Sequence, residues 1–123
     1  MPKVCQLPEG FQAGRRAKRD TEYFGHAIRY LETLQVKGKR VLDLGASTGD
    51  FAYLALDQGA KHVTTVEDED EYWSIITHNL SLRFPAHKWT LLKGAVTSQE
   101  QQFTQKQKGH IFDFAEILRS SRC

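Results

Sequence analysis

The sequence predicts an α/β fold in which helices flank an open, Rossmann-like parallel sheet. Three observations predict it. Short aliphatic and β-branched runs alternate with segments whose apolar residues recur every three or four positions, which is the pattern of βαβ units. The first of these runs leads directly into a turn bounded by glycines, and the second is followed by an acidic residue. These features indicate a sheet that binds a ligand at the carboxyl ends of its strands.

The first expected element is a helix that follows a basic N-terminal arm at residues 1–19. Its apolar residues are spaced as on one face of a helix: Tyr23, Phe24, Ala27, Ile28, Leu31 and Leu34. Asp20 or Thr21 is the expected N-cap, and the helix is expected to end near Lys37 and Gly38. Residues 20–123 are expected to form a single domain.

The next three elements form a strand, a turn and a helix. Arg40 to Leu44 has the apolar content of a buried strand, and the segment from Gly45 to Gly49 is a glycine-bounded turn. Residues 50–58 are mostly good helix formers, and Gly59 follows them as a C-cap.

Two further strands and a helix follow. The strands are expected at 62–66 and 89–92, and the helix at 69–83. Residues 111–114 are expected to form a fourth strand or the start of a last helix. A polar connection at 98–108 is expected to be partly helical. Strands joined by helical crossovers are parallel. With the first strand at the centre, the strand order is 3-2-1-4, which places the ligand crevice between strands 1 and 4.

The composition is that of a globular domain. The chain has 123 residues, of which 40% are apolar and 26% charged. The longest apolar run, at 51–56, is far shorter than a membrane span of roughly 20 residues. The N-terminus does not have the pattern of a secretory signal. Cys5 and Cys123 are expected to be free thiols, and no metal site is expected from the spacing of the five histidines. We therefore expect a cytoplasmic protein with no membrane partner.

The glycine turn and the acid after the second strand are spaced as in nucleotide-binding folds. Gly45 permits backbone conformations that are closed to other residues, and Gly49 lets the next helix begin close to a ligand. Glu67 follows Gly49 by 18 residues, near the offset of roughly 20 at which a carboxylate binds ribose hydroxyls. The two signals together predict a cofactor that contains a ribose.

The segment from Asp43 to Gly49, Asp-Leu-Gly-Ala-Ser-Thr-Gly, resembles the first motif of class I S-adenosylmethionine (SAM) dependent methyltransferases. That motif has the form acid-x-Gly-x-Gly-x-Gly. Ser47 replaces its middle glycine, as in the FtsJ and haemolysin-like branch. The resemblance covers about residues 36–97 and implies a SAM cofactor. The glycines alone leave a dinucleotide open, but Asp43 lies inside the strand and favours a cationic sulfonium cofactor.

The resemblance implies the cofactor-binding residues, which follow the first three strands: Asp43, Gly45, Ala46, Ser47, Gly49, Glu67, Asp68, Gly94 and Ala95. The turn would line the methionine and ribose portion. Asp43 would organise the turn or meet the SAM ammonium, Glu67 would bind both ribose hydroxyls, and Asp68 would flank the adenine. The two residues of the third strand would offer backbone groups there. No catalytic residue can be named.

Two branches of the methyltransferases fit different parts of the chain. Residues 79–80 and 89–98 resemble FkbM-type methyltransferases, which methylate mostly hydroxyl groups of natural products and glycans. The stretch from residues 36–39 through residues 59–61 resembles the haemolysin-like and FtsJ ribose methyltransferases, which act on RNA. The basic run at 15–19 favours RNA. The acceptor is therefore expected to be a small molecule, a glycan or RNA ribose.

The predicted fold is an incomplete class I methyltransferase fold. Such domains usually have seven strands, whereas four are expected here, and the elements on the acceptor side are absent. The alternative function is therefore a truncated SAM-binding module, or an inactive relic with a regulatory or RNA-binding role. The open sheet edge at the fourth strand also predicts that the chain either forms a homo-oligomer through that edge or is marginally stable.

Overall fold

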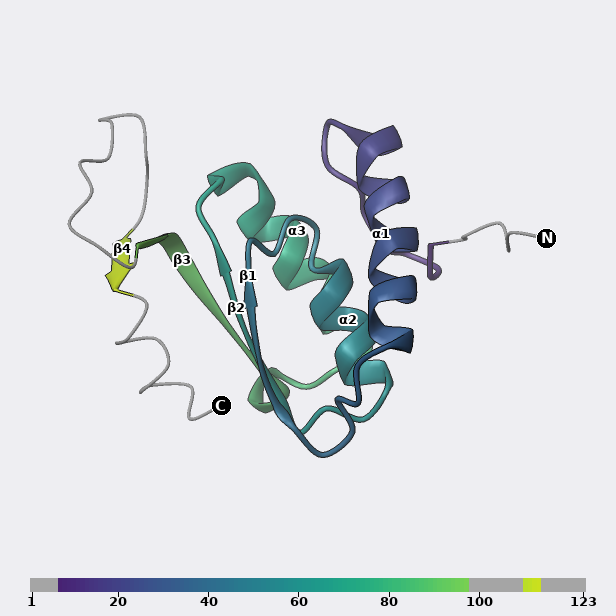
Figure 1. Ribbon diagram of the computed structural model, residues 1–123. Coiled ribbons are helices and arrows are strands. Elements are labelled where there is room, and N and C mark those ends of the chain that lie inside the picture. The colour runs from purple at the N-terminus through teal and green to yellow at the C-terminus, as the bar shows by residue number, and fades with distance from the viewer. Residues whose placement is uncertain (1–6, 98–109, 114–123) are drawn as a thin grey trace.

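The computed structural model describes residues 7–97 and 110–113, and it has the expected α/β fold (Figure 1). Helices and strands alternate along the chain: α1 (Ala17–Glu32), β1 (Arg40–Leu44), α2 (Asp50–Asp57), β2 (His62–Glu67), α3 (Asp70–Ser81), a 3₁₀ turn η1 (Ala86–Lys88), β3 (Trp89–Thr97) and β4 (His110–Asp113). All strand pairs are parallel. The sequence periodicity therefore predicted the element types correctly.

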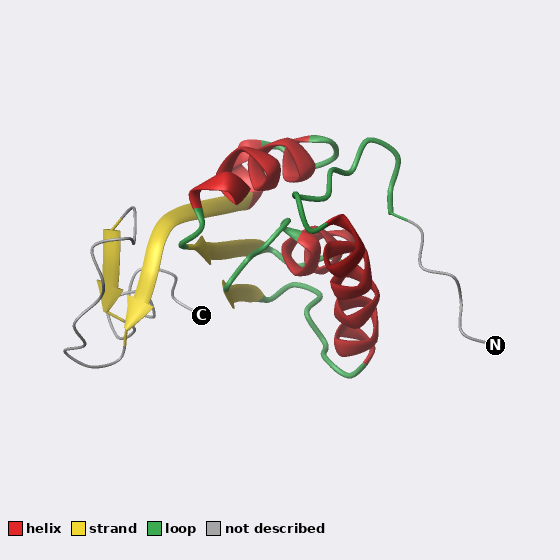
Figure 2. Ribbon diagram, turned by 90° about the horizontal axis from the view of Figure 1, so that it is seen from above, coloured by secondary structure: helices red, strands yellow, loops and turns green. Residues whose placement is uncertain are grey.

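The fourth strand changes the predicted topology. β1, β2 and β3 lie side by side as expected, but β4 pairs with β3 and not with β1, so the expected order 3-2-1-4 is corrected to β1-β2-β3-β4. The reason is the length of β3. Residues 89–93 pair with β2, whereas residues 94–97 extend beyond the end of β2 and pair with β4 (Figure 2). A backbone that leaves a sheet needs new hydrogen-bond partners, and β4 supplies them.

Two expectations from the sequence concern residues that the structure does not describe. The polar connection at 98–108 and residue 114 lie outside the described residues. The side chains of β4 are not among those described, so self-association through the edge at this strand stays a prediction.

All three helices lie on one face of the sheet (Figures 1 and 2). α1 begins at Ala17, three residues before the expected start, and Arg16 takes the N-cap position. Asp20 is therefore not a cap. It is buried, and its carboxylate accepts hydrogen bonds from the Gly14 N–H at 2.8 Å and from the Tyr72 hydroxyl. The helix starts early because these bonds hold Asp20 inside the first turn.

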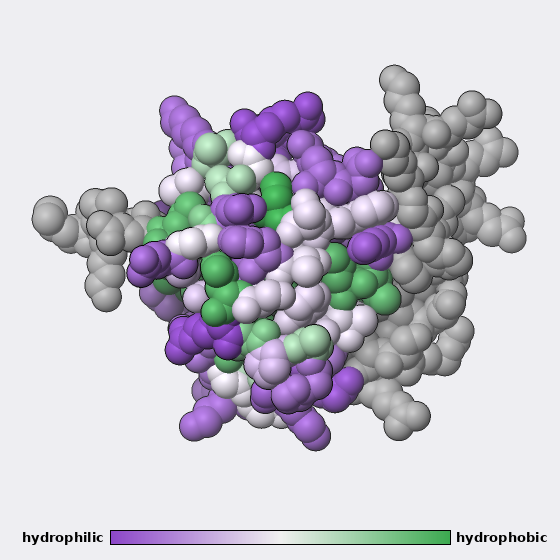
Figure 3. Space-filling model, turned by 180° about the vertical axis from the view of Figure 1, so that it is seen from behind, coloured by the Kyte–Doolittle hydropathy of each residue, from purple (hydrophilic) through white to green (hydrophobic). Residues whose placement is uncertain are grey.

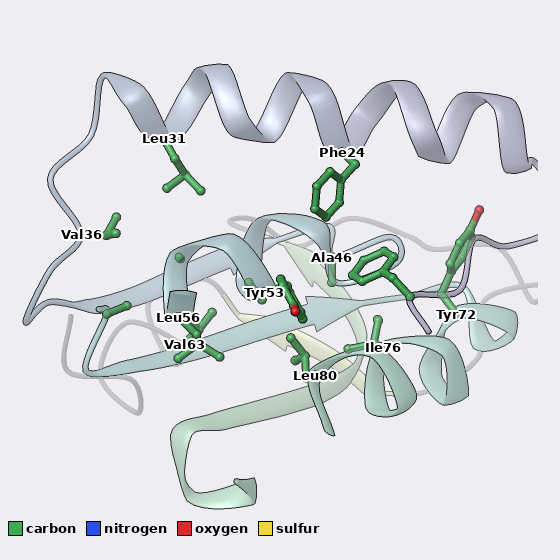
Figure 4. Packing of buried hydrophobic residues seen from close by; sticks show 14 residues of the cluster. Phe24, Leu31, Val36, Ala46, Tyr53, Leu56, Val63, Tyr72, Ile76 and Leu80 are labelled. Atoms are coloured by element: carbon green, nitrogen blue, oxygen red, sulfur yellow. The ribbon is translucent and has the colours of Figure 1, made fainter. Parts of the chain in front are cut away.

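The core lies between these helices and the sheet (Figure 4). Its largest contributions come from one face of each helix and from β2: Phe24, Leu31, Tyr53, Leu56, Val63, Tyr72, Ile76 and Leu80. Their spacings of three, four and seven residues within each helix are those of a single helical face, so the core fixes how each helix is turned toward the sheet.

Residues 10–14 form a strap that packs over the helices. The Phe11 ring meets the rings of Phe24 and Tyr53, with centroids 5.2 and 5.5 Å apart. Both contacts are edge-on, the geometry that aromatic pairs prefer. Thus part of the segment expected as a basic arm belongs to the packed domain.

The molecular surface is mixed. Seen from behind, apolar residues form separate patches between hydrophilic ones (Figure 3). None of the helices that the structure describes has the length and apolar character needed to cross a bilayer.

Candidate functional site

A hollow of about 220 Å³ lies at the carboxyl ends of β1, β2 and β3. Three adjacent strands contribute to its lining: Leu44, Gly45, Val66, Asp68, Gly94, Ala95 and Val96. Four of the nine residues expected to bind a cofactor are among them: Gly45, Asp68, Gly94 and Ala95. Parallel sheets bind ligands at this edge, because the loops there vary without disturbing the sheet.

The glycine turn reaches the hollow through a left-handed backbone. Gly45, Ser47 and Gly49 have φ angles of +85°, +52° and +84°. A Cβ added at Gly45 would meet nothing within 4 Å, so this position is open toward the hollow that it lines. Ser47 adopts the conformation that the middle glycine of the motif would adopt more easily, at a cost of about 1–2 kcal/mol.

Hydrogen bonds offset that cost by tying the turn to the end of β2. The N–H groups of Gly45 and Ala46 both donate to the Val66 carbonyl at 2.9 Å. The Ser47 N–H donates to Glu67 Oε1 at 2.6 Å. The turn is therefore positioned before any ligand arrives.

Glu67 connects the turn to the start of α3. Glu67 is only 6% exposed. Its second carboxylate oxygen, Oε2, accepts a hydrogen bond from the Glu69 N–H at 2.9 Å. Burial raises the pKa of the Glu67 carboxyl, and the N–H groups of Glu69 and Ser47 oppose this rise. A carboxylate has about four acceptor sites, so two protein donors leave capacity for hydroxyl groups of a ligand. Glu67 itself does not line the hollow, although both its neighbours in the chain do.

Asp43 lies in β1 below the turn. Its side chain is only partly exposed and accepts a hydrogen bond from Thr65 Oγ1 on β2 at 2.9 Å. Burial raises the pKa of Asp43 to about 6, against the effect of the Thr65 bond. A cation bound near a buried carboxyl group stabilises the charged form of that group and lowers its pKa.

Asp50 is a second acid of this kind, and the sequence analysis did not single it out. It is the first residue of α2, it is buried, and its Oδ1 accepts a hydrogen bond from the Phe51 N–H at 2.7 Å. Burial raises the pKa of Asp50 to about 6, and the charges of Asp43 and Asp20 act in the same direction. Its only sequence signal is its place directly after the turn.

Replacing Asp50 with Asn should stabilise the domain at high pH. The folded pKa of about 6 exceeds the ordinary 3.8, so the fold favours the neutral acid. Protonation of Asp50 therefore stabilises the folded state. This stabilisation is complete below pH 3.8, declines as the pH rises, and is lost above pH 6. Asn keeps the oxygen that accepts from Phe51 and does not titrate. We expect Asp50→Asn to raise the unfolding free energy at about pH 8 by up to about 3 kcal/mol, and by much less at about pH 4.

Urea denaturation across this pH range measures the effect. The control is Asp57→Asn at the other end of α2, where the acid pairs with Arg83 on the surface. It should change stability by no more than about 1 kcal/mol at any pH. A gain from Asp50→Asn that is equal at low and high pH would rule out titration of this carboxyl as its source.

Asn79 is the second residue that sequence reasoning missed as a part of the site. It is fully buried in α3, and its Nδ2 group donates to the carbonyls of Thr48 at 2.8 Å and Gln12 at 2.9 Å. Its Oδ1 accepts from the Gln12 N–H at 2.7 Å. One amide therefore joins α3, the strap and the glycine turn. The available signal was a polar residue on the apolar face that carries Tyr72 and Ile76.

The turn also carries two buried hydroxyl groups, although neither Ser47 nor Thr48 lines the hollow. Ser47 Oγ and Thr48 Oγ1 are buried and have no hydrogen-bond partner within the described residues. Buried polar atoms are nearly always paired, so each such atom marks a place where a partner belongs. The described side chains contain no group of three His, Cys, Asp or Glu residues that suits a metal ion. Together with the open position at Gly45, this turn fits an organic cofactor.

The family model of the FtsJ-like methyltransferases matches residues 25–115, which is more than half of the chain. The chain belongs to the FtsJ-like methyltransferase family. This membership confirms the resemblance to class I SAM-dependent methyltransferases and supports SAM as the cofactor. Of the two branches that the sequence left open, the FtsJ-like one is the branch that is matched.

Solved structures resemble this FtsJ-like chain. A Pyrococcus horikoshii protein assigned as an RNA methyltransferase is 28% identical, with a TM-score of 0.51, over 74% of this chain and 44% of its own. A protein from Streptococcus mutans assigned as a SAM-dependent methyltransferase is 19% identical, with a TM-score of 0.47, over 59% of this chain and 19% of its own. A SAM-dependent methyltransferase from Mesorhizobium loti is 22% identical, with a TM-score of 0.46, over 58% of this chain and 30% of its own.

The FtsJ-like chain therefore spans less than half the length of each of these three proteins. No curated protein matches its sequence significantly.

Proposed function

We propose that the chain holds SAM in the hollow at the strand ends and transfers its methyl group to a ribose hydroxyl of RNA. The glycine turn carries this proposal, because Gly45 opens into a hollow lined by three strand ends in an FtsJ-like chain. Two further observations support RNA. The Pyrococcus protein is assigned as an RNA methyltransferase, and residues 1–40 have nine Lys and Arg against four acids. A cytoplasmic location, as expected from the sequence, is part of the proposal.

Each part of the site would hold one part of SAM. The turn from Gly45 to Gly49, with Ala46 and Ser47, would take the methionine and ribose portion, and Asp43 beneath it would offset the positive charge. The remaining acceptor sites of Glu67 would take the ribose hydroxyls. The adenine side would be formed by the residues at the ends of β2 and β3: Asp68, Gly94 and Ala95.

The residues of this chain contribute positioning. SAM, when bound, supplies a methyl group that its sulfonium has already activated. The site must then hold the acceptor in line with that methyl group and exclude water. The same geometry also fits the alternative of a module that binds SAM without transferring the methyl group, since the chain covers 44% of the Pyrococcus protein.

Two measurements on the full chain test the proposal. Isothermal titration with SAM and with S-adenosylhomocysteine (SAH) tests the cofactor site. Incubation with SAM labelled in its methyl group, an unmodified RNA and a DNA of the same sequence tests the acceptor. Mass spectrometry of the nuclease digest locates the methyl group. We expect binding of both cofactor forms and label only in the RNA, on the ribose.

Other outcomes have distinct meanings. No binding of either cofactor form contradicts the whole proposal. Binding without transfer to any acceptor contradicts the enzyme and favours the SAM-binding module. Transfer to small hydroxyl compounds or glycans, but not to RNA, contradicts the RNA acceptor and favours the function implied by the FkbM-type resemblance.

A further inference from the structure

The exposed side of α1 carries a row of cationic and aromatic residues. One of them, Arg19, also donates hydrogen bonds to the buried Tyr72 hydroxyl at 3.0 Å and to Asp20 at 3.5 Å. Successive members are three or four positions apart and so lie along one side of the helix. We name the row the α1 stripe: Arg16, Arg19, Tyr23, His26 and Tyr30. Tyr23 is 43% exposed and Tyr30 is 63% exposed, although both side chains are large and largely apolar. The buried apolar residues of α1, Phe24, Ala27 and Leu31, lie beside the stripe, and the helix packs mainly against α2. Four stripe residues are exposed, and Arg19 is half-buried.

The flat groups of the stripe lie close to one another. The guanidinium carbon of Arg19 lies 5.3 Å from the centroid of the Tyr23 ring. The Tyr23 and His26 rings are 6.0 Å apart and inclined by 36°. The Tyr30 ring meets that of Phe51 at 6.2 Å. Phe51 is the second residue of α2, so the C-terminal end of the stripe packs against the start of that helix.

A basic hollow lies at the other end of the stripe. Its volume is about 500 Å³. It is lined by four basic residues and one acid, with one alanine: Arg15, Arg16, Ala17, Lys18, Arg19 and Glu22. The lining therefore carries an excess of positive charge, which suits a group with negative charge.

Acidic neighbours neutralise only part of this charge. Arg15 pairs with Glu71 at 3.3 Å, and Arg19 pairs with Asp20 at 3.5 Å. Within the described part of the chain, the other two basic side chains of the hollow take part in no ion pair. A phosphate in the hollow would therefore meet two cations that are not already committed to a carboxylate.

We propose that the α1 stripe and the basic hollow bind a single-stranded segment of RNA, with phosphates at the hollow and bases stacked on Tyr23 and Tyr30. Proteins that bind single strands combine a cationic surface with exposed aromatic rings, because every unpaired base offers a face for stacking. A duplex hides these faces. The stripe is about 21 Å long, at 1.5 Å per residue, which accommodates several nucleotides. This inference rests on the proposed RNA acceptor. It adds that the bound RNA is single-stranded and names the surface that binds it.

Fluorescence anisotropy of the full chain with a labelled, unstructured RNA of about 12 nucleotides tests the proposal. An unlabelled duplex of the same sequence serves as competitor. We expect the double variant Tyr23→Ala/Tyr30→Ala to bind the single strand roughly tenfold more weakly or worse. The double variant Arg16→Ala/Lys18→Ala should bind more weakly at about 50 mM salt, and its slope of log K against log salt should be shallower by about 1.4.

Matched controls separate the surface from general effects. Lys39→Ala/Lys61→Ala removes two exposed cations at the amino ends of β1 and β2, and Leu82→Ala removes an exposed apolar side chain at the end of α3. Both should bind RNA like the wild type. Circular dichroism and SAH titration should show that the stripe variants are folded and keep their cofactor affinity.

Three outcomes would overturn the proposal. The first is that the stripe variants bind RNA as the wild type does. The second is that the duplex competes as well as the single strand. The third is that the tyrosine variant loses self-association in light scattering but not RNA binding, which would identify the stripe as a protein interface. If the wild type methylates RNA and the stripe variants do so equally well, only the stripe fails. If the wild type binds no RNA in any form, the proposed RNA acceptor fails as well.

Discussion

Gly45→Ala should abolish most of the cofactor affinity and leave a folded domain. The added Cβ would meet no protein atom within 4 Å, and Gly45 lines the hollow, so the methyl group would occupy space that the ligand needs. We expect SAH to bind at least about tenfold more weakly in isothermal titration, equivalent to about 1.4 kcal/mol. The φ angle of +85° also strains any residue other than glycine, by about 1–2 kcal/mol.

Gly38→Ala provides a closely matched control. Gly38 precedes β1, at the opposite end of the strand from the hollow, and has a φ angle of +73° with no atom within 4 Å of an added Cβ. Thermal melting should show a similar loss of stability in both variants, and only Gly45→Ala should lose SAH affinity. Equal affinities in the two variants would mean that Gly45 shapes the turn without touching the ligand.

Glu67→Ala should weaken SAH binding by about 1.5–3 kcal/mol, the typical value of hydrogen bonds to a charged acceptor. The substitution removes the acceptor of the Ser47 and Glu69 N–H groups and the carboxylate proposed for the ribose. Isothermal titration well below the melting temperature measures the change. Glu67→Gln keeps the size of the side chain, but it removes the charge and replaces one of the two acceptor oxygens with an NH2 donor, so only one of the Ser47 and Glu69 hydrogen bonds can remain.

Glu69→Ala is the control for Glu67. Glu69 is an exposed acid two residues further on, and its contribution to the site is its backbone N–H, which the substitution keeps. Its SAH affinity should match that of the wild type. If folded Glu67→Gln also binds like the wild type, the carboxylate is only a brace for the turn, and the ribose assignment is lost.

The sequence predicted best what depends on neighbouring residues. The strand, turn and helix from Arg40 to Asp57 appear at the expected positions, because glycine spacing and helix formers act locally. The place of β4 was not predictable in this way. It depends on how far β3 extends beyond β2, and no local pattern marks that length. The early start of α1 likewise depends on Tyr72, which lies 52 residues from Asp20.

In the candidate site, too, the sequence predicted what depends on local spacing and missed what depends on contacts between distant segments. The spacing between Gly45 and Asp68 reflects one strand-turn-helix-strand unit, so the sequence placed both residues, and both line the hollow. Asn79 and Asp50 owe their importance to burial against other segments. A sequence displays the residue type but not the neighbours that pair with it.

The side-chain amide of Asn79 bonds to both the strap and the glycine turn, so the opening of one affects the stability of the other. The Gln12 N–H is bonded to Asn79, so it exchanges with deuterium from solvent only when the strap lifts. Lifting the strap breaks two of the three bonds that orient the amide, and thus loosens its hold on the Thr48 carbonyl. Coupling between two sites is reciprocal. A ligand that rigidifies the turn therefore slows exchange at Gln12, although the strap does not line the hollow.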